Sequence, residues 1–190
     1  MITGGRDIYQ ASMGVDMALL FYGIKSEEIE SVEAVADGYR HEFWVPTCDH
    51  LVPRGMSCFP YLLWSFLHYL RIFHNRDYSI FLVFHNDRII HHSIITPGYF
   101  RFPFMAFDDL QIGDVWTDEK HRGKGITICA IRNIVNHHSK PGRKFWYIVD
   151  QGNIPSIKAA ERAGLVEICQ GVKKKLFGLN LLATFRKTDD

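Results

Sequence analysis

The sequence predicts a mixed α/β fold in which helices flank a central β-sheet. Strand-like and helix-like segments alternate in the second half of the chain, an order that suits such a sheet. A glycine-rich turn, residues 121–127 (His-Arg-Gly-Lys-Gly-Ile-Thr), joins one strand-like segment to one helix-like segment. The composition, 47% hydrophobic and 23% charged over 190 residues, is that of one globular domain.

Composition also sets expectations about partners and location. The formal charge of +1 gives no reason to expect a nucleic acid partner. Residues 1–10 lack the basic-then-apolar pattern of a secretory signal, and the four cysteines form no C-x-x-C pair. The apolar run 59–73 is interrupted by polar residues and is shorter than the about 20 residues of a membrane span. We expect a cytoplasmic protein without a membrane span.

The first half is predicted to begin with a strand at residues 17–24. Residues 26–35 read as a short helix, although residues 31–44 also alternate in part like a strand. Residues 45–56 contain two prolines and a glycine and are predicted to be a loop. Apolar residues at helical spacing then predict a helix within residues 57–73.

The second half is predicted to begin with a β-hairpin, because two β-branched segments flank the turn at residues 85–88. An aromatic loop, residues 97–109, follows it. The remaining predicted elements are a strand at 110–117, a helix at 126–138, a strand at 145–149, a helix at 155–163 that ends at Gly164, and closing strands at 165–169 and 176–186.

The glycine-rich turn indicates a phosphate site. The first N–H groups of a helix have no partner inside it, and with the helix dipole they attract a phosphate group. A nucleoside triphosphate loop, G-x-x-x-x-G-K-[ST], does not fit, because Lys124 lies between Gly123 and Gly125. A dinucleotide motif, G-x-G-x-x-G, does not fit either, because position 128 is Ile.

The turn resembles the acyl-CoA pyrophosphate loop of the GNAT acyltransferase superfamily, [QR]-x-x-G-x-[GA]. Arg122 and Gly125 match it, whereas Thr127 departs, since the family prefers glycine or alanine there. The Thr127 hydroxyl is nevertheless able to donate to a phosphate. The strand before the turn, residues 113–118, resembles the family strand that binds the pantetheine arm and polarises the thioester carbonyl.

A second family signature, N-x-x-S-x(7)-G-[FL], is similar to residues 153–165. Together these resemblances cover roughly residues 110–168. They imply one domain, residues 1–190, with a variable acceptor-side part (1–76) and a sheet with the acyl-CoA core (77–190). The implied cofactor-binding residues are Val115, Trp116, Thr117, Arg122, Gly123, Lys124, Gly125, Ile126, Thr127, Asn153 and Ser156.

The resemblance implies transfer of an acyl group from acetyl-CoA or another acyl-CoA to an amine, without a metal. Such a reaction needs a base for the amine proton. Asp114, in the cofactor strand, and His91 and His92, in the neighbouring strand, are the candidates, and strand alternation allows only one of the two histidines to face the cleft. Many family members have a tyrosine acid four residues after the motif serine, whereas Ala160 occupies that position here.

The expected acceptor is a small-molecule amine. Residues 102–105 and 113–117 resemble segments of proteins associated with surface-polysaccharide synthesis, which implies a nucleotide-linked amino sugar. The sequence leaves open a peptide or protein amine, a non-catalytic CoA sensor of the same fold, and a site for another phosphate ligand. A homodimer is also left open.

Overall fold

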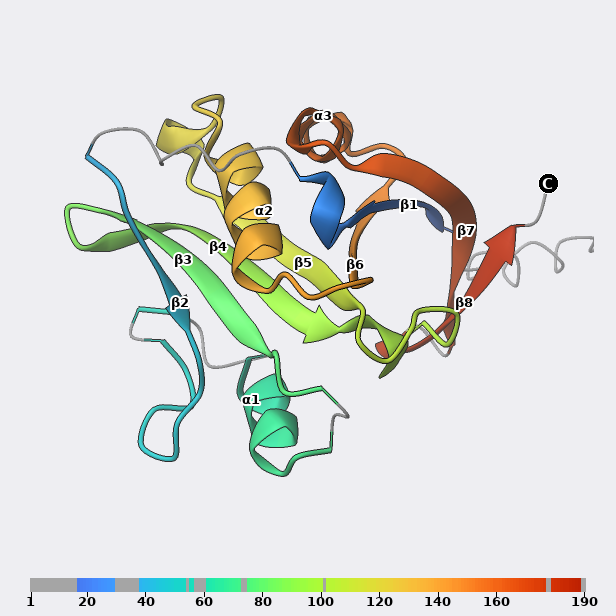
Figure 1. Cartoon of the computed structure of the whole chain (residues 1–190), viewed down its shortest axis with the longest axis horizontal. Coiled ribbons are helices and arrows are strands. Elements are labelled where there is room, and N and C mark those ends of the chain that lie inside the picture. Colours follow the sequence, from blue (N-terminus) through green and yellow to red (C-terminus); the bar gives the residue numbers. More distant parts are fainter. Residues whose placement is uncertain are drawn as a thin grey trace, which may run out of the picture.

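The computed structural model describes residues 17–29, 38–53, 55–56, 61–72, 75–100, 102–176 and 179–188. Among these residues, eight strands form one mixed sheet in the order β2-β3-β4-β5-β6-β1-β7-β8 (Figure 1). The mixed α/β fold that the sequence predicts is confirmed. Two of the strands, β1 and β2, come from the N-terminal part of the chain that the sequence assigns to the acceptor side.

Strands and helices alternate from β5 onward, as the sequence predicts. The strands are β1 (Met17–Lys25), β2 (Arg40–Trp44), β3 (Ser79–His85), β4 (Arg88–Pro97), β5 (Leu110–Thr117), β6 (Lys144–Asp150), β7 (Val166–Leu176) and β8 (Leu179–Thr188). The α-helices are α1 (Tyr61–Tyr69), α2 (Ile126–His137) and α3 (Ile154–Ala163), and the 3-10 helices are η1 (Ser26–Glu28), η2 (Gly98–Phe100) and η3 (Glu119–His121). None of the described helices is long and apolar enough to cross a membrane.

Within the described residues, the predicted helix at residues 26–35 is shorter than expected. Only η1 is helical, and the backbone is extended again at Ile29, with φ −78° and ψ 130°. Residues 30–37 lie outside the described residues. The competing strand pattern of residues 31–44 agrees at its end with β2, which pairs with β3. At the other end of the chain, β7 continues through Gly171, where the sequence predicted a break, because it is paired on both sides, with β1 and β8.

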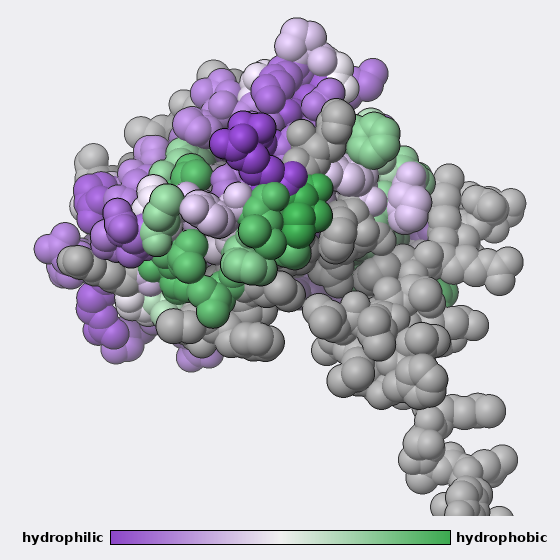
Figure 2. Space-filling model, turned by 90° about the horizontal axis from the view of Figure 1, so that it is seen from below, coloured by the Kyte–Doolittle hydropathy of each residue, from purple (hydrophilic) through white to green (hydrophobic). Residues whose placement is uncertain are grey.

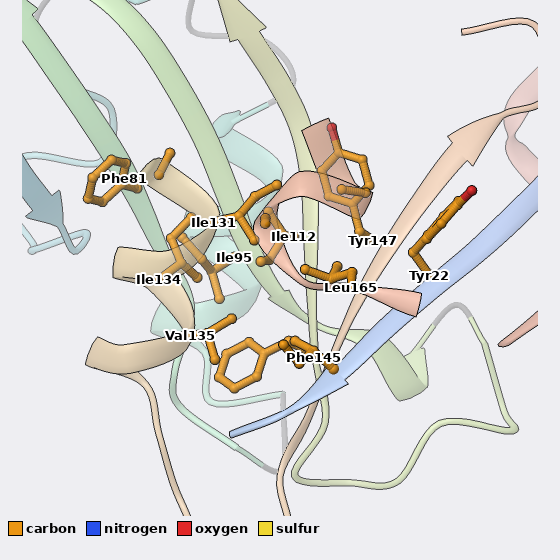
Figure 3. Packing of buried hydrophobic residues seen from close by; sticks show 14 of the residues in the cluster. Tyr22, Phe81, Ile95, Ile112, Ile131, Ile134, Val135, Phe145, Tyr147 and Leu165 are labelled. Atoms are coloured by element: carbon orange, nitrogen blue, oxygen red, sulfur yellow. The ribbon is translucent and has the colours of Figure 1, made fainter. Parts of the chain in front are cut away.

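The main core lies between the sheet and the helices α2 and α3. Helix α2 contributes apolar side chains at helical spacing, namely Ile126, Ala130, Ile131, Ile134 and Val135. They pack on Ile95, Ile112 and Phe145 of the central strands (Figure 3). This packing fixes the start of α2, and therefore the glycine-rich turn, against the end of β5.

The opposite face of the sheet has two smaller clusters. Tyr78, Ile80 and Leu82 belong to one of them, and His68 of α1 packs its ring against Tyr78 at 5.6 Å between centroids. Part of the predicted aromatic loop covers the other, because Phe102 is buried against β1 and β6. Figure 2 views the molecule from the side on which α1 lies, and hydrophobic residues gather there.

The sheet opens between its two central parallel strands. The pairing of β5 with β6 runs from Leu110 with Phe145 to Ile112 with Tyr147. Both strands continue beyond these residues, β5 to Thr117 and β6 to Asp150, but they no longer pair with each other. The strands therefore diverge toward their carboxyl ends, where parallel α/β sheets commonly bind ligands.

An ion pair between Arg143, just before β6, and Asp77, just before β3, lies at the end of α2. The Arg143 side chain is fully buried and donates to the Asp77 carboxylate and to the His138 carbonyl. Burial raises the pKa of Asp77, but hydrogen bonds from Lys140 and Arg143 outweigh it, so the pKa lies below the usual value. The ionised carboxylate therefore stabilises the folded state.

We predict that Asp77→Asn lowers the free energy of unfolding by about 3 kcal/mol, because it leaves the buried Arg143 charge without a counter-ion. Since the folded-state pKa is lowered, the stabilisation is present above the ordinary carboxyl pKa and is lost as the pH falls through the lowered value. Denaturant unfolding at neutral pH and below about pH 4 would check both the size of the loss and its disappearance in acid.

The matched control is Asp87→Asn. The Asp87 side chain is 99% exposed and lies 3.8 Å from Arg40, so its loss should change stability by no more than about 0.5 kcal/mol. Equal effects of the two substitutions at neutral pH would contradict the assignment.

Candidate functional site

A cleft of about 550 Å³ lies where β5 and β6 diverge. It is bounded by the end of β5, the glycine-rich turn with the first residues of α2, and the start of α3. The lining residues are Val115, Trp116, Thr117, His121, Arg122, Gly123, Gly125, Ile126, Thr127, Ile128, Asn153, Pro155, Ser156, Lys158, Ala159 and Arg162. The structure thus brings together all the predicted cofactor residues except Lys124.

A β-bulge shapes the β5 side of the cleft. Gly113 pairs with Ile94 and Trp116 pairs with His92, so two residues of β5 stand opposite Ser93 alone. One of the two is Asp114, whose φ of 44° lies in the left-handed region. The bulge is a local departure from strand alternation, and it re-aims the side chains that follow it.

The register shows which face of the sheet each side chain occupies. Directly paired residues share a face. His92 pairs with Leu82 of the α1-side cluster and with Trp116, so all three lie on the α1 side. His91 pairs with Val83 of the main core and with Thr117, so these lie on the α2 side.

The glycines of the turn have backbone conformations that favour glycine. Gly123 and Gly125 both have a φ of 75°, and Gly125 is the N-cap residue of α2. Helical hydrogen bonding from Gly125 begins with its carbonyl, which accepts from the Cys129 N–H at 3.0 Å. The backbone N–H groups before Cys129, at the start of the helix, have no partner within the helix. They lie at the positive end of the helix dipole, beside the cleft.

The two cations of the turn point in different directions. Arg122 lines the cleft, and its Nε donates to the Thr117 carbonyl at 3.1 Å, which fastens the turn to the end of β5. Lys124 does not line the cleft, because its Nζ donates to the Tyr39 hydroxyl at 3.2 Å. The Tyr39 hydroxyl also lies 2.9 Å from Nδ1 of His121.

Helix α3 forms the opposite wall. Asn153 is its N-cap, with Oδ1 accepting from the Ser156 N–H at 3.3 Å. The further lining residues of this wall, which were not predicted from the sequence, are Pro155, Lys158, Ala159 and Arg162. They continue the face of Ser156 and Asn153 at helical spacing, which is the signal that would have found them.

The electrostatic character of the cleft is positive. Arg122, Lys158 and Arg162 are among its lining residues, and none of the described lining residues is a carboxylate. Together with the start of α2, these side chains suit a ligand that carries several phosphate groups.

His91 and His92, adjacent in the chain, have different environments. His91 is fully buried, and its two ring nitrogens lie 2.8 Å from the Thr117 hydroxyl and 2.9 Å from the Ser93 hydroxyl. Burial, with a smaller contribution from His92, lowers the pKa of His91 to about 3, so this ring is neutral at physiological pH. His91 therefore lies on the α2 side of the sheet, with both ring nitrogens beside hydroxyl groups, and does not reach the α1 side.

His92 and Asp114 form a pair on the α1 side. Nε2 of His92 lies 3.6 Å from the Asp114 carboxylate, and the imidazole stacks on Trp116 at 5.5 Å between centroids. The side chain of Asp114 is 53% exposed, whereas that of His92 is 14% exposed. The structure thus brings two of the three predicted base candidates together beside the bulge.

Comparison with known proteins gives one family. The model of the acetyltransferase (GNAT) family matches residues 40–165, about two thirds of the chain. No match was found among curated proteins.

Solved structures with the same fold include a GCN5-related N-acetyltransferase from Sphaerobacter thermophilus, with 16% identity and a TM-score of 0.57 over 83% of this chain and 50% of that one. A Drosophila protein has 9% identity and a TM-score of 0.58 over the same shares of the two chains. A tandem GNAT protein from the clavulanic acid biosynthesis pathway has 14% identity and a TM-score of 0.54 over 84% of this chain and 53% of that one. The chain spans about half the length of these structures.

We predict that Asn153→Ala lowers the free energy of unfolding by about 1 kcal/mol, because the first turn of α3 loses its capping acceptor. Asn153→Asp should retain the stability, since its carboxylate accepts the same bond at a helix N-terminus. Thermal or denaturant unfolding of both variants is the measurement. An alanine variant as stable as the parent would show that the cap contributes nothing, leaving Asn153 only its place in the cleft.

Proposed function

Because the chain belongs to the acetyltransferase (GNAT) family, we propose that it transfers an acyl group from an acyl-CoA to the amine of a small molecule. Acetyl-CoA is the proposed donor. The amine attacks the thioester directly, without a covalent enzyme intermediate, so the protein's task is to align the two substrates and stabilise the developing charge.

The observation that carries this proposal is the cleft between β5 and β6. It opens beside the unpaired amides at the start of α2, and its walls carry Arg122, Lys158 and Arg162. A CoA molecule combines a pyrophosphate, which needs such amides and cations, with a long neutral arm, which needs an open strand edge. In the cleft, the amides and cations at the start of α2 lie next to the open edge of β5.

In the proposed complex, the pyrophosphate lies on the turn from Arg122 to Thr127 and the pantetheine arm runs along the end of β5. Val115, Trp116 and Thr117 are the strand residues that line the cleft. A backbone N–H of this segment, beside the bulge, is the proposed donor to the thioester oxygen as it becomes an oxyanion.

We propose Asp114 as the base, with His92 orienting its carboxylate. Asp114 is exposed on the α1 side, and His92 lies 3.6 Å away, held against Trp116. This arrangement supports a proton acceptor on the side of the sheet opposite α2, where an amine could approach the thioester. His91 is left out of this role, because it is buried on the α2 side with both nitrogens engaged.

The acceptor would therefore approach from the side on which α1 lies. Trp116 is 41% exposed there, and Figure 2 shows that hydrophobic residues gather on this side. An exposed indole face suits a sugar ring, which supports an amino sugar, free or nucleotide-linked, as the first acceptor class to test. A peptide amine is the alternative acceptor.

A non-catalytic CoA-binding protein is the second candidate, and one observation favours it. Ala160, at the position of the family tyrosine, is fully buried in the core and carries no proton to donate. Transfer would then release the CoA thiolate unprotonated. That step is chemically acceptable, because a thiol of pKa about 8.5 is a fair leaving group.

Release of free CoA from acetyl-CoA, measured with a panel of amino sugars, nucleotide-linked amino sugars and peptides, tests the proposal. Turnover with an amine supports the transferase. Tight CoA binding without turnover on any amine supports the sensor. Thermal stabilisation by ATP but not by CoA would overturn both.

We predict that Gly125→Ala weakens CoA binding at least tenfold. The added Cβ meets no atom within 4 Å in the protein itself, so the obstruction would come from the bound pyrophosphate. Isothermal titration with CoA is the measurement.

Gly142→Ala is the matched control for this variant. Gly142 has the same φ of 75° and the same open space around its Cβ, but it lies in the turn before β6, outside the cleft. Both variants should lose about the same stability, roughly 1 kcal/mol, from the left-handed backbone. If Gly125→Ala bound CoA as well as Gly142→Ala did, the pyrophosphate would not lie on this turn.

We predict that Asp114→Asn lowers kcat by about 10²- to 10⁴-fold and leaves the Kd for CoA unchanged, because only the proton acceptor is removed. Asparagine tolerates the left-handed conformation at this position, so the bulge should persist. Steady-state kinetics on the best acceptor and CoA titration separate the two effects. An unchanged kcat would exclude Asp114 as the base.

A further inference from the structure

A row of polar side chains runs from the sheet to the cleft on the α2 side. The Ser93 hydroxyl lies 2.9 Å from Nε2 of His91, and Nδ1 of the same ring lies 2.8 Å from the Thr117 hydroxyl. The Thr117 hydroxyl in turn lies 3.3 Å from the hydroxyl of Thr127. We call these four residues the hydroxyl–histidine chain. Thr117 and Thr127 line the cleft, whereas Ser93 and His91 are fully buried.

The hydrogen bonds of the hydroxyl–histidine chain can run consistently in either of two directions. A neutral imidazole carries one N–H, and each hydroxyl has one proton to donate. The proton on Nδ1 makes His91 donate to Thr117, so that Thr117 donates to Thr127, while Nε2 accepts from Ser93. The proton on Nε2 reverses every bond. Burial lowers the pKa of His91 to about 3, which keeps the ring neutral and so keeps the choice binary.

The two directions present different groups to the cleft. With the proton on Nδ1, the Thr127 oxygen accepts from Thr117, and its own O–H is left to donate to a ligand. With the proton on Nε2, the Thr127 O–H is used up on Thr117, and only oxygen lone pairs face the ligand. A negatively charged phosphate oxygen favours the first direction and is repelled by the second.

We propose that His91 is a positioning residue, whose Nδ1–H tautomer orients Thr117 and Thr127 so that the Thr127 hydroxyl donates to a phosphate oxygen of bound CoA. This inference rests on the proposed function, since it takes the ligand to be CoA. It assigns a purpose to a threonine at a turn position, and to a buried histidine that has no place in the proton transfer.

The geometry ties the hydroxyl–histidine chain to the proposed cofactor site. It links three separate elements, β4, β5 and the first turn of α2, and both of its cleft-side members belong to the cofactor wall. Because each buried polar atom has its partner within the chain, a change at Ser93 or His91 alters the proton direction at Thr127 without touching the ligand.

The first test is CoA binding by Thr127→Val and Thr127→Ser, measured by isothermal titration. Valine keeps the shape of the side chain and removes the donor, so it should weaken CoA binding about 10- to 100-fold, the effect of one hydrogen bond to a charged group. Serine keeps the hydroxyl and should bind within a few-fold of the parent. Equal affinity of the valine variant and the parent would overturn the proposal.

The second test reads the tautomer directly, on the unaltered protein. Nitrogen-15 NMR of histidine-labelled protein distinguishes the protonated from the unprotonated ring nitrogen of His91, with His91→Gln used only to assign the signal. In the CoA complex we expect the proton on Nδ1, and a proton on Nε2 would overturn the proposal. The proposal requires both results together, namely the proton on Nδ1 in the CoA complex and the weaker CoA binding of Thr127→Val.

The two proposals fail differently. If the parent protein binds no CoA in the titration, the proposed function fails before the tautomer is measured. If the parent binds CoA while Thr127→Val binds equally well, or while His91 holds its proton on Nε2, the proposed function stands and the positioning role of His91 is wrong.

Discussion

The divergence of β5 from β6 is the constraint on which the site depends. Two parallel strands that pair only from Leu110 to Ile112 leave the rest of β5 with an open edge toward the cleft. That edge lies beside the start of α2 because the α2 side chains Ile131 and Ile134 are packed into the core under it. The position of the glycine-rich turn is therefore a result of core packing, and the turn needs only to supply the backbone conformation.

A single bulge divides the work between the two faces of the sheet. Around Asp114 the alternation of β5 shifts, whereas the neighbouring strand β4 presents its consecutive histidines to opposite sides by ordinary strand alternation. On the α1 side, His92 meets a carboxylate and an indole; on the α2 side, His91 meets two hydroxyls. Proton transfer and cofactor recognition are thereby separated by the thickness of one strand in the functions we propose.

The sequence predicted the parts of this arrangement that are local. The glycines at 123 and 125 predicted a turn at a helix start, and both have the positive φ that explains their identity. Strand alternation predicted that His91 and His92 face opposite sides of the sheet. The pairing of His92 with Asp114 could not be predicted from the sequence, because it depends on the register of β4 with β5 and on the bulge at Asp114. The direction of Lys124 was also hidden, since Tyr39, its partner, lies far away in the chain. Of the helix expected after residue 26, the described residues form only the 3-10 helix η1, and the backbone is already extended at Ile29.

The place of β1 in the sheet has a consequence for how the protein is made. This strand is the first described element of the chain, yet it lies between β6 and β7, pairing Lys25 with Lys144 and Gly23 with Val166. During synthesis, its two edges stay unpaired until β6 and β7, residues 144–176, have been translated. Such non-local pairing slows folding and exposes strand edges to wrong partners. The nascent chain therefore carries an apolar strand whose two edges remain unpaired until both β6 and β7 have been made.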